Sequence, residues 1–323
     1  MRRLLRLCAA PILLLGLAGC GSGTVSDPGG SHSTAAGAIT VDTARGPVSL
    51  PRPATRVVSL EWTYTEELIA LGVPPVGNAD SATYSTWVTA PGAALPASVT
   101  DVGKRNEPSI EQITALRPDL IVASEDRVGA GYEQLSKIAP VLSFDYTVAP
   151  QLETMRKNFT ALATAVGAQD RAAEVLGRID TAASDLAGRL AQAGKAGQEY
   201  ALAQGYSVNG VPSIRLLTDD AFSPQVLNRA GLRNGWRGKP DDWGMTTVGV
   251  EGLTQVPPSV TFLSVAAVND DPFTGALAGN PVWRGLAFVG EGRAKSLDPG
   301  TWLFGGPLSA LHLLDETAKA LGV

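Results

Sequence analysis

The chain has 323 residues, with 26 lysines and arginines against 31 aspartates and glutamates, a formal net charge of −5. This acidic balance excludes most nucleic-acid-binding classes, which need basic surfaces, and the length allows two domains of ordinary size. The two cysteines, Cys8 and Cys20, lie near the N-terminus, and the two histidines, His32 and His312, cannot build a histidine-rich metal site. We therefore expect no metal or cofactor bound directly by the protein.

The N-terminus has the pattern of an export signal. Basic residues at the start precede a mostly apolar stretch, 4–17, that is too short to span a bilayer permanently. Residues 17–20 (Leu-Ala-Gly-Cys) resemble the bacterial lipobox, which implies cleavage before Cys20 and lipid attachment to it; an ordinary secretion signal is the alternative. Small and polar residues follow to position 38 and predict a flexible tether. We expect a protein that is lipid-anchored to the cell membrane on its extracytoplasmic face.

From residue 39 onward, β-rich runs alternate with amphipathic stretches, which is typical of α/β proteins. Capping-box spacings, Thr63 to Glu66 and Ser109 to Gln112, each predict the start of a helix. Further elements of this half are predicted as strands at 56–60, 73–76, 120–123 and 141–144 and a helix at 131–138.

A longer helix is predicted next, because apolar residues recur at spacings of three and four up to Gly167. It is long enough to cross between two lobes, and a surface helix within a single domain is the alternative. Beyond it, Asp170 starts another helix and Ser223-Pro224 has the N-cap and N1 pattern. The remaining elements are strands near 200–204, 214–218 and 260–265 and a final helix at 307–321. The predicted organisation is a signal peptide (1–19), a tether (20–38), an N-terminal α/β lobe (39–149), a linking helix (150–168) and a C-terminal α/β lobe (169–323).

Catalysis has little support in the sequence. The segment 205–209 (Gly-Tyr-Ser-Val-Asn) lacks the last glycine of a nucleophile elbow, and no phosphate-binding glycine loop is present. A cell-surface hydrolase would need a nucleophile and a base, yet His312 is the one histidine beyond the tether. We expect a protein that is not an enzyme.

Side chains suited to a ligand surface are easier to find. Arg105 lies in a turn before a helix start and suits anionic oxygens, unless it pairs with Glu107 or Asp101. Several aromatic residues fall in connecting segments and either line a ligand site or close the core of a lobe: Tyr84, Trp87, Trp236, Trp243 and Trp302. Trp283 is assigned to packing.

Several of these segments together resemble the iron-siderophore substrate-binding proteins of ABC importers, and above all the ferric-hydroxamate (ferrichrome) binding members. The segments are 59–62 (Ser-Leu-Glu-Trp), 84–88 (Tyr-Ser-Thr-Trp-Val), 101–108 (Asp-Val-Gly-Lys-Arg-Asn-Glu-Pro), 242–244 (Asp-Trp-Gly), 281–283 (Pro-Val-Trp) and 301–304 (Thr-Trp-Leu-Phe). The resemblance implies two α/β lobes joined by a single long helix, with a ferric siderophore of hydroxamate type in the cleft. The iron is then held by the siderophore, and a monomer delivers it to an ABC permease.

The resemblance also implies roles for particular residues. Its ligand-binding set is Tyr84, Trp87, Arg105, Arg127, Trp243, Trp302 and Phe304. At Arg127 the relatives have a cleft tyrosine, and Ala123 replaces a tryptophan, so another hydroxamate, a carboxylate or a mixed siderophore is an alternative ligand. Glu111 and Glu251 are implied in permease docking, with helix stabilisation as the alternative. Cobalamin or haem on the same scaffold, and an adhesin without a small ligand, are the other hypotheses.

Overall fold

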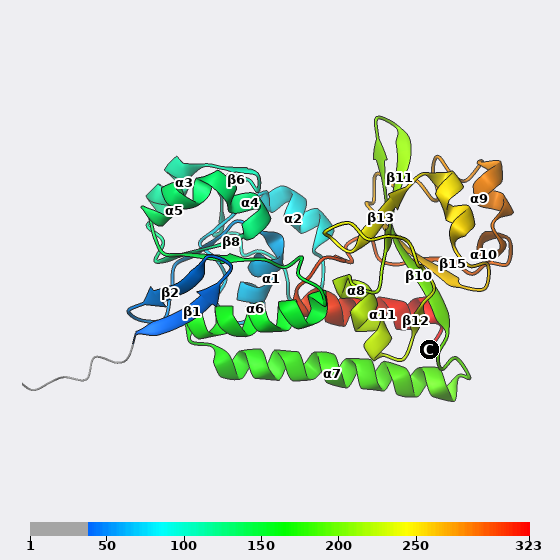
Figure 1. Cartoon of the computed structure of the whole chain (residues 1–323), viewed down its shortest axis with the longest axis horizontal. Coiled ribbons are helices and arrows are strands. Elements are labelled where there is room, and N and C mark those ends of the chain that lie inside the picture. Colours follow the sequence, from blue (N-terminus) through cyan, green and yellow to red (C-terminus); the bar gives the residue numbers. More distant parts are fainter. Residues whose placement is uncertain (1–37) are drawn as a thin grey trace, which may run out of the picture. The chain divides into compact units, whose positions relative to one another are not determined.

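The computed structural model describes residues 38–323, which belong to one compact unit. The predicted signal peptide (1–19), Cys20 and the tether up to residue 37 lie outside the described residues. Two β-sheets form the centres of two lobes, called here the N-terminal and C-terminal lobes, and two consecutive helices lead the chain from one to the other (Figure 1). The predicted fold class is therefore confirmed, whereas the residue boundaries of the lobes remain a prediction.

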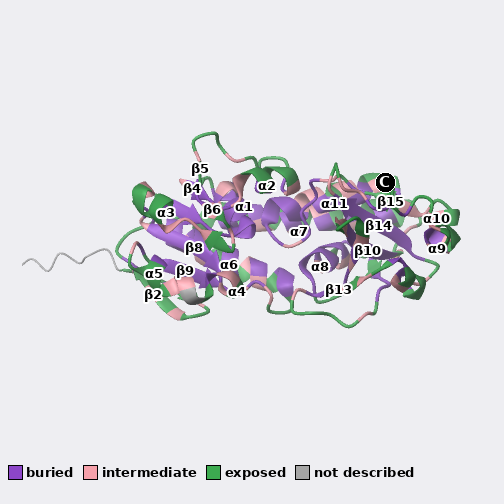
Figure 2. Ribbon diagram, turned by 90° about the horizontal axis from the view of Figure 1, so that it is seen from above, coloured by how far each residue is buried: buried purple, intermediate pink, exposed green. Residues whose placement is uncertain are grey.

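The N-terminal lobe is built on a parallel sheet of five short strands in the order β5-β4-β3-β8-β9. Every residue of the strands β3, β8 and β9 is buried, as expected for a parallel sheet that is covered on both faces (Figure 2). The strands are β3 (Val57–Ser59), β4 (Gly77–Asn78), β5 (Thr100–Asp101), β8 (Leu120–Ser124) and β9 (Val141–Phe144). The helices are α1 (Trp62–Ala70), α2 (Ser81–Trp87), α3 (Ile110–Leu116), α4 (Glu125–Val128), the 3-10 turn η1 (Gly129–Gly131) and α5 (Tyr132–Ser136). Two hairpins complete the lobe: β1 (Ile39–Thr43) with β2 (Gly46–Leu50), and β6 (Gly103–Lys104) with β7 (Glu107–Pro108).

The C-terminal lobe has a mixed sheet in the order β13-β11-β10-β14-β15, with β12 pairing with β10. Strands β10, β14 and β15 are parallel, whereas β10, β11 and β13 form an antiparallel meander. The strands are β10 (Glu199–Val208), β11 (Val211–Leu217), β12 (Arg233–Asn234), β13 (Met245–Val248), β14 (Thr261–Ala266) and β15 (Ala294–Ser296). The helices are α8 (Phe222–Arg229), the 3-10 helix η2 (Val250–Gln255), α9 (Pro281–Gly285), α10 (Ala287–Gly290) and α11 (Pro307–Leu321).

The helices α6 (Gln151–Val166) and α7 (Gln169–Gln192) connect the two sheets along the chain. Helix α6 contacts β1 and α1 of the N-terminal lobe and α8 of the C-terminal lobe, and α7 runs along α6 and α11 (Figure 1). The apolar face of α6 is buried as predicted, and α6 ends at Gly167, which adopts φ 73°. One apolar cluster contains Tyr64, Phe159 and Leu313, so the core continues from one lobe into the other. No helix between residues 38 and 323 has the length and apolar character of a membrane span.

Two helix starts differ from the sequence prediction. Helix α1 is capped by Glu61, whose carboxylate accepts from the backbone N–H of Trp62, while Glu66 accepts from the backbone N–H of Ser309 at 2.7 Å. Helix α8 begins after Ala221, and the Ser223 hydroxyl donates to a carbonyl 80 residues away. In both places the side chain that local spacing predicted as part of a helix cap forms a hydrogen bond with a residue far away in the sequence instead. The strand predicted at 73–76 is also wrong, because the strand that pairs in the sheet is β4, directly after it.

Candidate functional site: a cavity between the two lobes

A cavity of about 380 Å³ is lined by side chains from both lobes. The N-terminal lobe contributes Glu61, Thr63, Arg105, Arg127 and Tyr146, and the C-terminal lobe and the segment before α11 contribute Arg215, Asp241, Trp243, Met245, Thr247, Trp302 and Phe304. A second cavity of about 240 Å³ shares Arg105, Arg215, Trp302 and Phe304 with the first and adds Trp62 and Trp87. The two cavities therefore form neighbouring parts of one site.

The topology of the parallel sheet explains why the N-terminal lobe contributes these residues. Glu61 follows β3, Arg127 follows β8 in α4, and Tyr146 follows β9. Arg105 lies in the β6-β7 hairpin that follows β5. Carboxyl ends of parallel strands share one edge of a sheet, and ligand sites form there in open α/β sheets.

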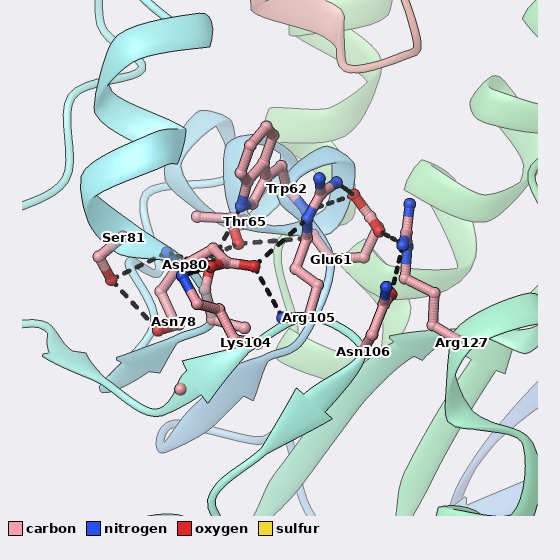
Figure 3. Close-up of polar contacts among 12 residues, drawn as sticks. Glu61, Trp62, Thr65, Asn78, Asp80, Ser81, Lys104, Arg105, Asn106 and Arg127 are labelled. Atoms are coloured by element: carbon pink, nitrogen blue, oxygen red, sulfur yellow. Dashed lines mark hydrogen bonds and ion pairs between the residues drawn. The ribbon is translucent and has the colours of Figure 1, made fainter. Parts of the chain in front are cut away.

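Glu61 holds two arginines in the cavity wall (Figure 3). Its side chain is 2% exposed, and its two oxygens accept from Nη1 of Arg105 at 2.9 Å and from Nε of Arg127 at 2.5 Å. Arg127 also donates from Nη1 to the side-chain oxygen of Asn106 at 2.6 Å. Burial opposes the positive charge of Arg127, but Glu61, Tyr146 and Asp126 together outweigh this effect and raise the pKa of Arg127. The shared carboxylate therefore fixes the orientation of both guanidinium groups.

Arg105 has further partners that fix its position. Its guanidinium carbon lies 3.5 Å from the ring centroid of Trp62, which is a close cation–π contact. Its backbone N–H donates to the Asp80 carboxylate at 2.8 Å. Burial acts to raise the pKa of Asp80, but this hydrogen bond and the contacts with Lys104 and Arg105 outweigh burial, so the pKa is lowered. The acidic partners of Arg105 are thus Glu61 and Asp80, and neither Glu107 nor Asp101 pairs with it.

Aromatic rings form the remaining walls in two groups. Trp302 packs edge-on against Trp62 at 5.2 Å between centroids and against Phe304 at 4.9 Å. Tyr146 packs against Trp243 at 5.1 Å, and the Arg127 guanidinium lies 5.6 Å from the Trp243 ring. Each group places an arginine beside an apolar ring surface, so the site offers contact area and charged donors side by side.

Among the residues singled out from the sequence, Arg105, Arg127, Trp243, Trp302 and Phe304 line the larger cavity, and Trp87 lines the smaller one. Tyr84 requires a correction: it is fully buried, and its hydroxyl donates to the carbonyl of Ala93 at 2.7 Å, so it is a core residue without cavity surface. Trp236 is buried in the core of the C-terminal lobe. The packing role assigned to Trp283 is confirmed by its contacts with Phe262, Phe273 and Phe288.

Sequence reasoning missed several lining residues, of which Glu61, Tyr146 and Arg215 matter most for the chemistry of the site. For Glu61 and Tyr146 a signal exists, because each is a polar residue directly after a buried strand of a parallel sheet. Arg215 has no comparable signal, since it lies within the strand β11 and alternation alone does not say which face meets a cavity.

The two glutamates assigned to docking lie outside both cavities. Glu111 is exposed in the first turn of α3, and Glu251 is exposed in η2 of the other lobe. Between residues 38 and 323, no group of three or more His, Cys, Asp or Glu side chains is placed to hold a metal ion.

A cavity between two α/β lobes that are joined by long helices is the arrangement of a substrate-binding protein of the periplasmic type. The chain belongs to the periplasmic binding protein family, whose profile matches residues 57–301. It is 31% identical over 268 residues to the iron(3+)-hydroxamate-binding protein FhuD of Escherichia coli (strain K12), covering 83% of this chain and 87% of that protein. It is 27% identical over 286 residues to the Fe(3+)-citrate-binding protein YfmC of Bacillus subtilis (strain 168), covering 88% and 86%.

A solved structure supports the same assignment. The siderophore-binding protein FhuD from Vibrio cholerae, determined with bound Fe³⁺-Desferal, superposes with a TM-score of 0.73 at 26% identity. The match covers 83% of this chain and 97% of that one. The family predicted from the sequence is thereby confirmed.

Proposed function

We propose that this protein is the extracytoplasmic substrate-binding lipoprotein of an ABC importer and captures a ferric siderophore of hydroxamate type. The main observation in support of this function is the cavity of about 380 Å³, whose walls combine aromatic rings and arginines from both lobes. A ferric trihydroxamate is a rounded and mostly apolar complex with oxygens on one side, which matches such walls. Relatives that bind iron(3+)-hydroxamate and Fe³⁺-Desferal support this ligand class.

In this proposal each group of side chains has a defined role. Arg105 and Arg127 donate to the chelate oxygens, while Trp243, Trp302 and Phe304 cover its apolar surface. Trp87 contacts the part of the ligand that extends into the smaller cavity. The siderophore itself holds the iron, so the protein needs no cofactor and breaks no bond, which makes it a receptor and not an enzyme.

Delivery requires the loaded protein to find its permease. We assign Glu111 and Glu251 to this step, because they are exposed acidic residues on different lobes and outside the cavities. Such a pair would meet basic residues on the two halves of a permease. Lipid on Cys20 keeps the monomeric receptor at the membrane during this exchange.

Tryptophan fluorescence tests the ligand assignment, since four of the six tryptophans, Trp62, Trp87, Trp243 and Trp302, line the cavities. The mature protein is titrated with ferrichrome, ferrioxamine B, ferric enterobactin and cobalamin. We expect saturable quenching by the ferric hydroxamates, and weaker binding in W243F but not in the core variant W236F. Absence of quenching by every ferric chelate would refute the proposal, and a response to cobalamin alone would support the cobalamin hypothesis.

The docking role is tested separately with the double variant E111A/E251A in cells that depend on this importer for iron. We expect uptake of the siderophore to be lost, while quenching of the purified variant by ferrichrome remains unchanged. A loss of affinity in solution would contradict a role confined to docking.

A further inference from the structure

Arg215 differs from the other two arginines of the site. It lies on β11 in the C-terminal lobe and lines both cavities. Its Nη1 donates to the side-chain oxygen of Gln204 at 3.0 Å, and its guanidinium carbon lies 4.5 Å from the ring centroid of Tyr206. No ion pair within residues 38–323 includes Arg215, whereas Arg105 and Arg127 share the Glu61 carboxylate.

The carboxylates near the larger cavity are engaged by other groups. Glu61 and Asp241 line the cavity with the three guanidinium groups, and the Asp80 carboxylate lies 3.9 Å from Nε of Arg105. Glu61 is already shared by the two arginines of the N-terminal lobe, and Asp241 accepts from the backbone N–H groups of Trp243 and Met245 at 2.9 and 3.1 Å. Neither carboxylate of the cavity wall therefore pairs with Arg215, whose guanidinium has no acidic partner within residues 38–323.

The neighbours of Arg215 orient the guanidinium without neutralising it. Gln204 is an uncharged acceptor that uses one N–H, and the Tyr206 ring supports the face of the group. A guanidinium has five N–H donors in a rigid fork, so a pair of donors remains for a carboxylate of the ligand. Ordering the side chain in advance lowers the entropy cost of binding such a group.

We propose that Arg215 forms an anion subsite, which binds a free carboxylate on the periphery of the ferric chelate. This inference rests on the proposed function and narrows it to chelates that carry a carboxylate in addition to their hydroxamates. The aromatic walls cover the apolar part of such a chelate. Arg215 binds the carboxylate of the chelate from the lobe opposite Arg105 and Arg127.

The test compares two chelates that share hydroxamate chemistry and differ in charge. Ferrichrome is uncharged, whereas ferric aerobactin is anionic: two hydroxamates and its citrate unit bind the iron, and the carboxylates of its two lysine units stay free on the periphery. Tryptophan quenching is measured for the wild type, for R215Q and for the control R178Q, which removes the same charge from an exposed position on α7 outside the cavities. We expect R215Q to weaken ferric aerobactin binding about tenfold or more, as for loss of a charge-assisted bidentate contact, and to change ferrichrome binding less than about threefold.

Two further results belong to the expected pattern. R215K, which keeps the charge and loses the fork, should bind ferric aerobactin with intermediate affinity. Added salt should weaken aerobactin binding in the wild type more than in R215Q, because screening acts on the charged contact. Urea unfolding of each variant verifies that the fold is retained.

The outcomes separate this inference from the proposed function. If ferrichrome binds but ferric aerobactin does not, or if R215Q affects both chelates equally or neither, the anion subsite is refuted and the receptor assignment stands. If neither these two chelates nor any other ferric chelate quenches the wild-type protein, the receptor assignment itself fails. A selective loss of aerobactin in R215Q with normal binding in R178Q supports the subsite.

Discussion

The substitution Glu61→Gln removes the negative charge that Arg105 and Arg127 share and keeps the size of the side chain. Glu61 is 2% exposed and each arginine side chain is 19% exposed, so water replaces the lost partner only in part. The glutamine oxygen can still accept from one donor, such as the N–H of Trp62 that Glu61 now caps. We expect a clear loss in the free energy of unfolding.

The size of this loss follows from the contacts. A hydrogen bond to a charged group contributes about 1.5–3 kcal/mol, and removal of one partner of a buried ion pair costs about 3–5 kcal/mol. Partial hydration of both guanidinium groups favours the lower end, about 3 kcal/mol. For a protein of this size that corresponds to a melting temperature lowered by roughly 6 °C.

Urea unfolding at pH 7, followed by far-ultraviolet circular dichroism, measures this difference. The matched control is Glu174→Gln, which makes the same chemical change in an exposed pair with Arg171 at 2.7 Å. Exposed pairs contribute little, so the control should lose less than about 0.5 kcal/mol. A free energy of unfolding for E61Q that equals that of the control would refute the conclusion that Glu61 holds the two arginines.

Three other substitutions test the structure. Burial raises the pKa of Glu66 to about 7, above the ordinary 4.5. The native state therefore binds the proton of the Glu66 carboxyl more tightly than the unfolded chain does. The resulting stability is present below about pH 4.5 and is lost as the pH rises through 7. E66Q should flatten the fall of the urea midpoint between about pH 5 and 8, and an unchanged slope would contradict this assignment. Gly306→Ala should lower the free energy of unfolding by about 2 kcal/mol or more, because φ is +89° and a Cβ would collide with the Glu66 carboxylate. The control Gly322→Ala, at φ +67° with open space around it, should lower the free energy of unfolding by about 1 kcal/mol. Equal losses of the two variants in thermal unfolding would argue against the collision. Tyr84→Phe should lower the free energy of unfolding by about 1 kcal/mol, because the hydrogen bond to the Ala93 carbonyl is lost, and should leave ferrichrome affinity unchanged. Weaker quenching by ferrichrome in this variant would show that Tyr84 contacts the ligand.

Much of the fold could be predicted because its signals are local. The spacing of apolar residues identified α6, and Gly167 marked its end, since a glycine can adopt the left-handed conformation found there. The boundaries of β9 and α11 agree with the prediction, and Ser109 caps α3 as its spacing to Gln112 indicated. Each of these features depends on residues within a few positions of one another.

The composition of the site depended on distant partners, which local patterns do not contain. Arg105 and Arg127 were identified by resemblance, but their shared partner Glu61 lies 44 and 66 residues away along the chain. Tyr84 and Trp87 belong to the same short helix, yet one is in the core and the other borders a cavity. Local spacing and resemblance were thus enough to establish the α/β class, the long helix between the lobes and most of the aromatic and arginine residues. Only packing between segments far apart in sequence decided which side chains face the cavity and which charges remain unpaired there, because burial and Coulomb energy depend on distances in space.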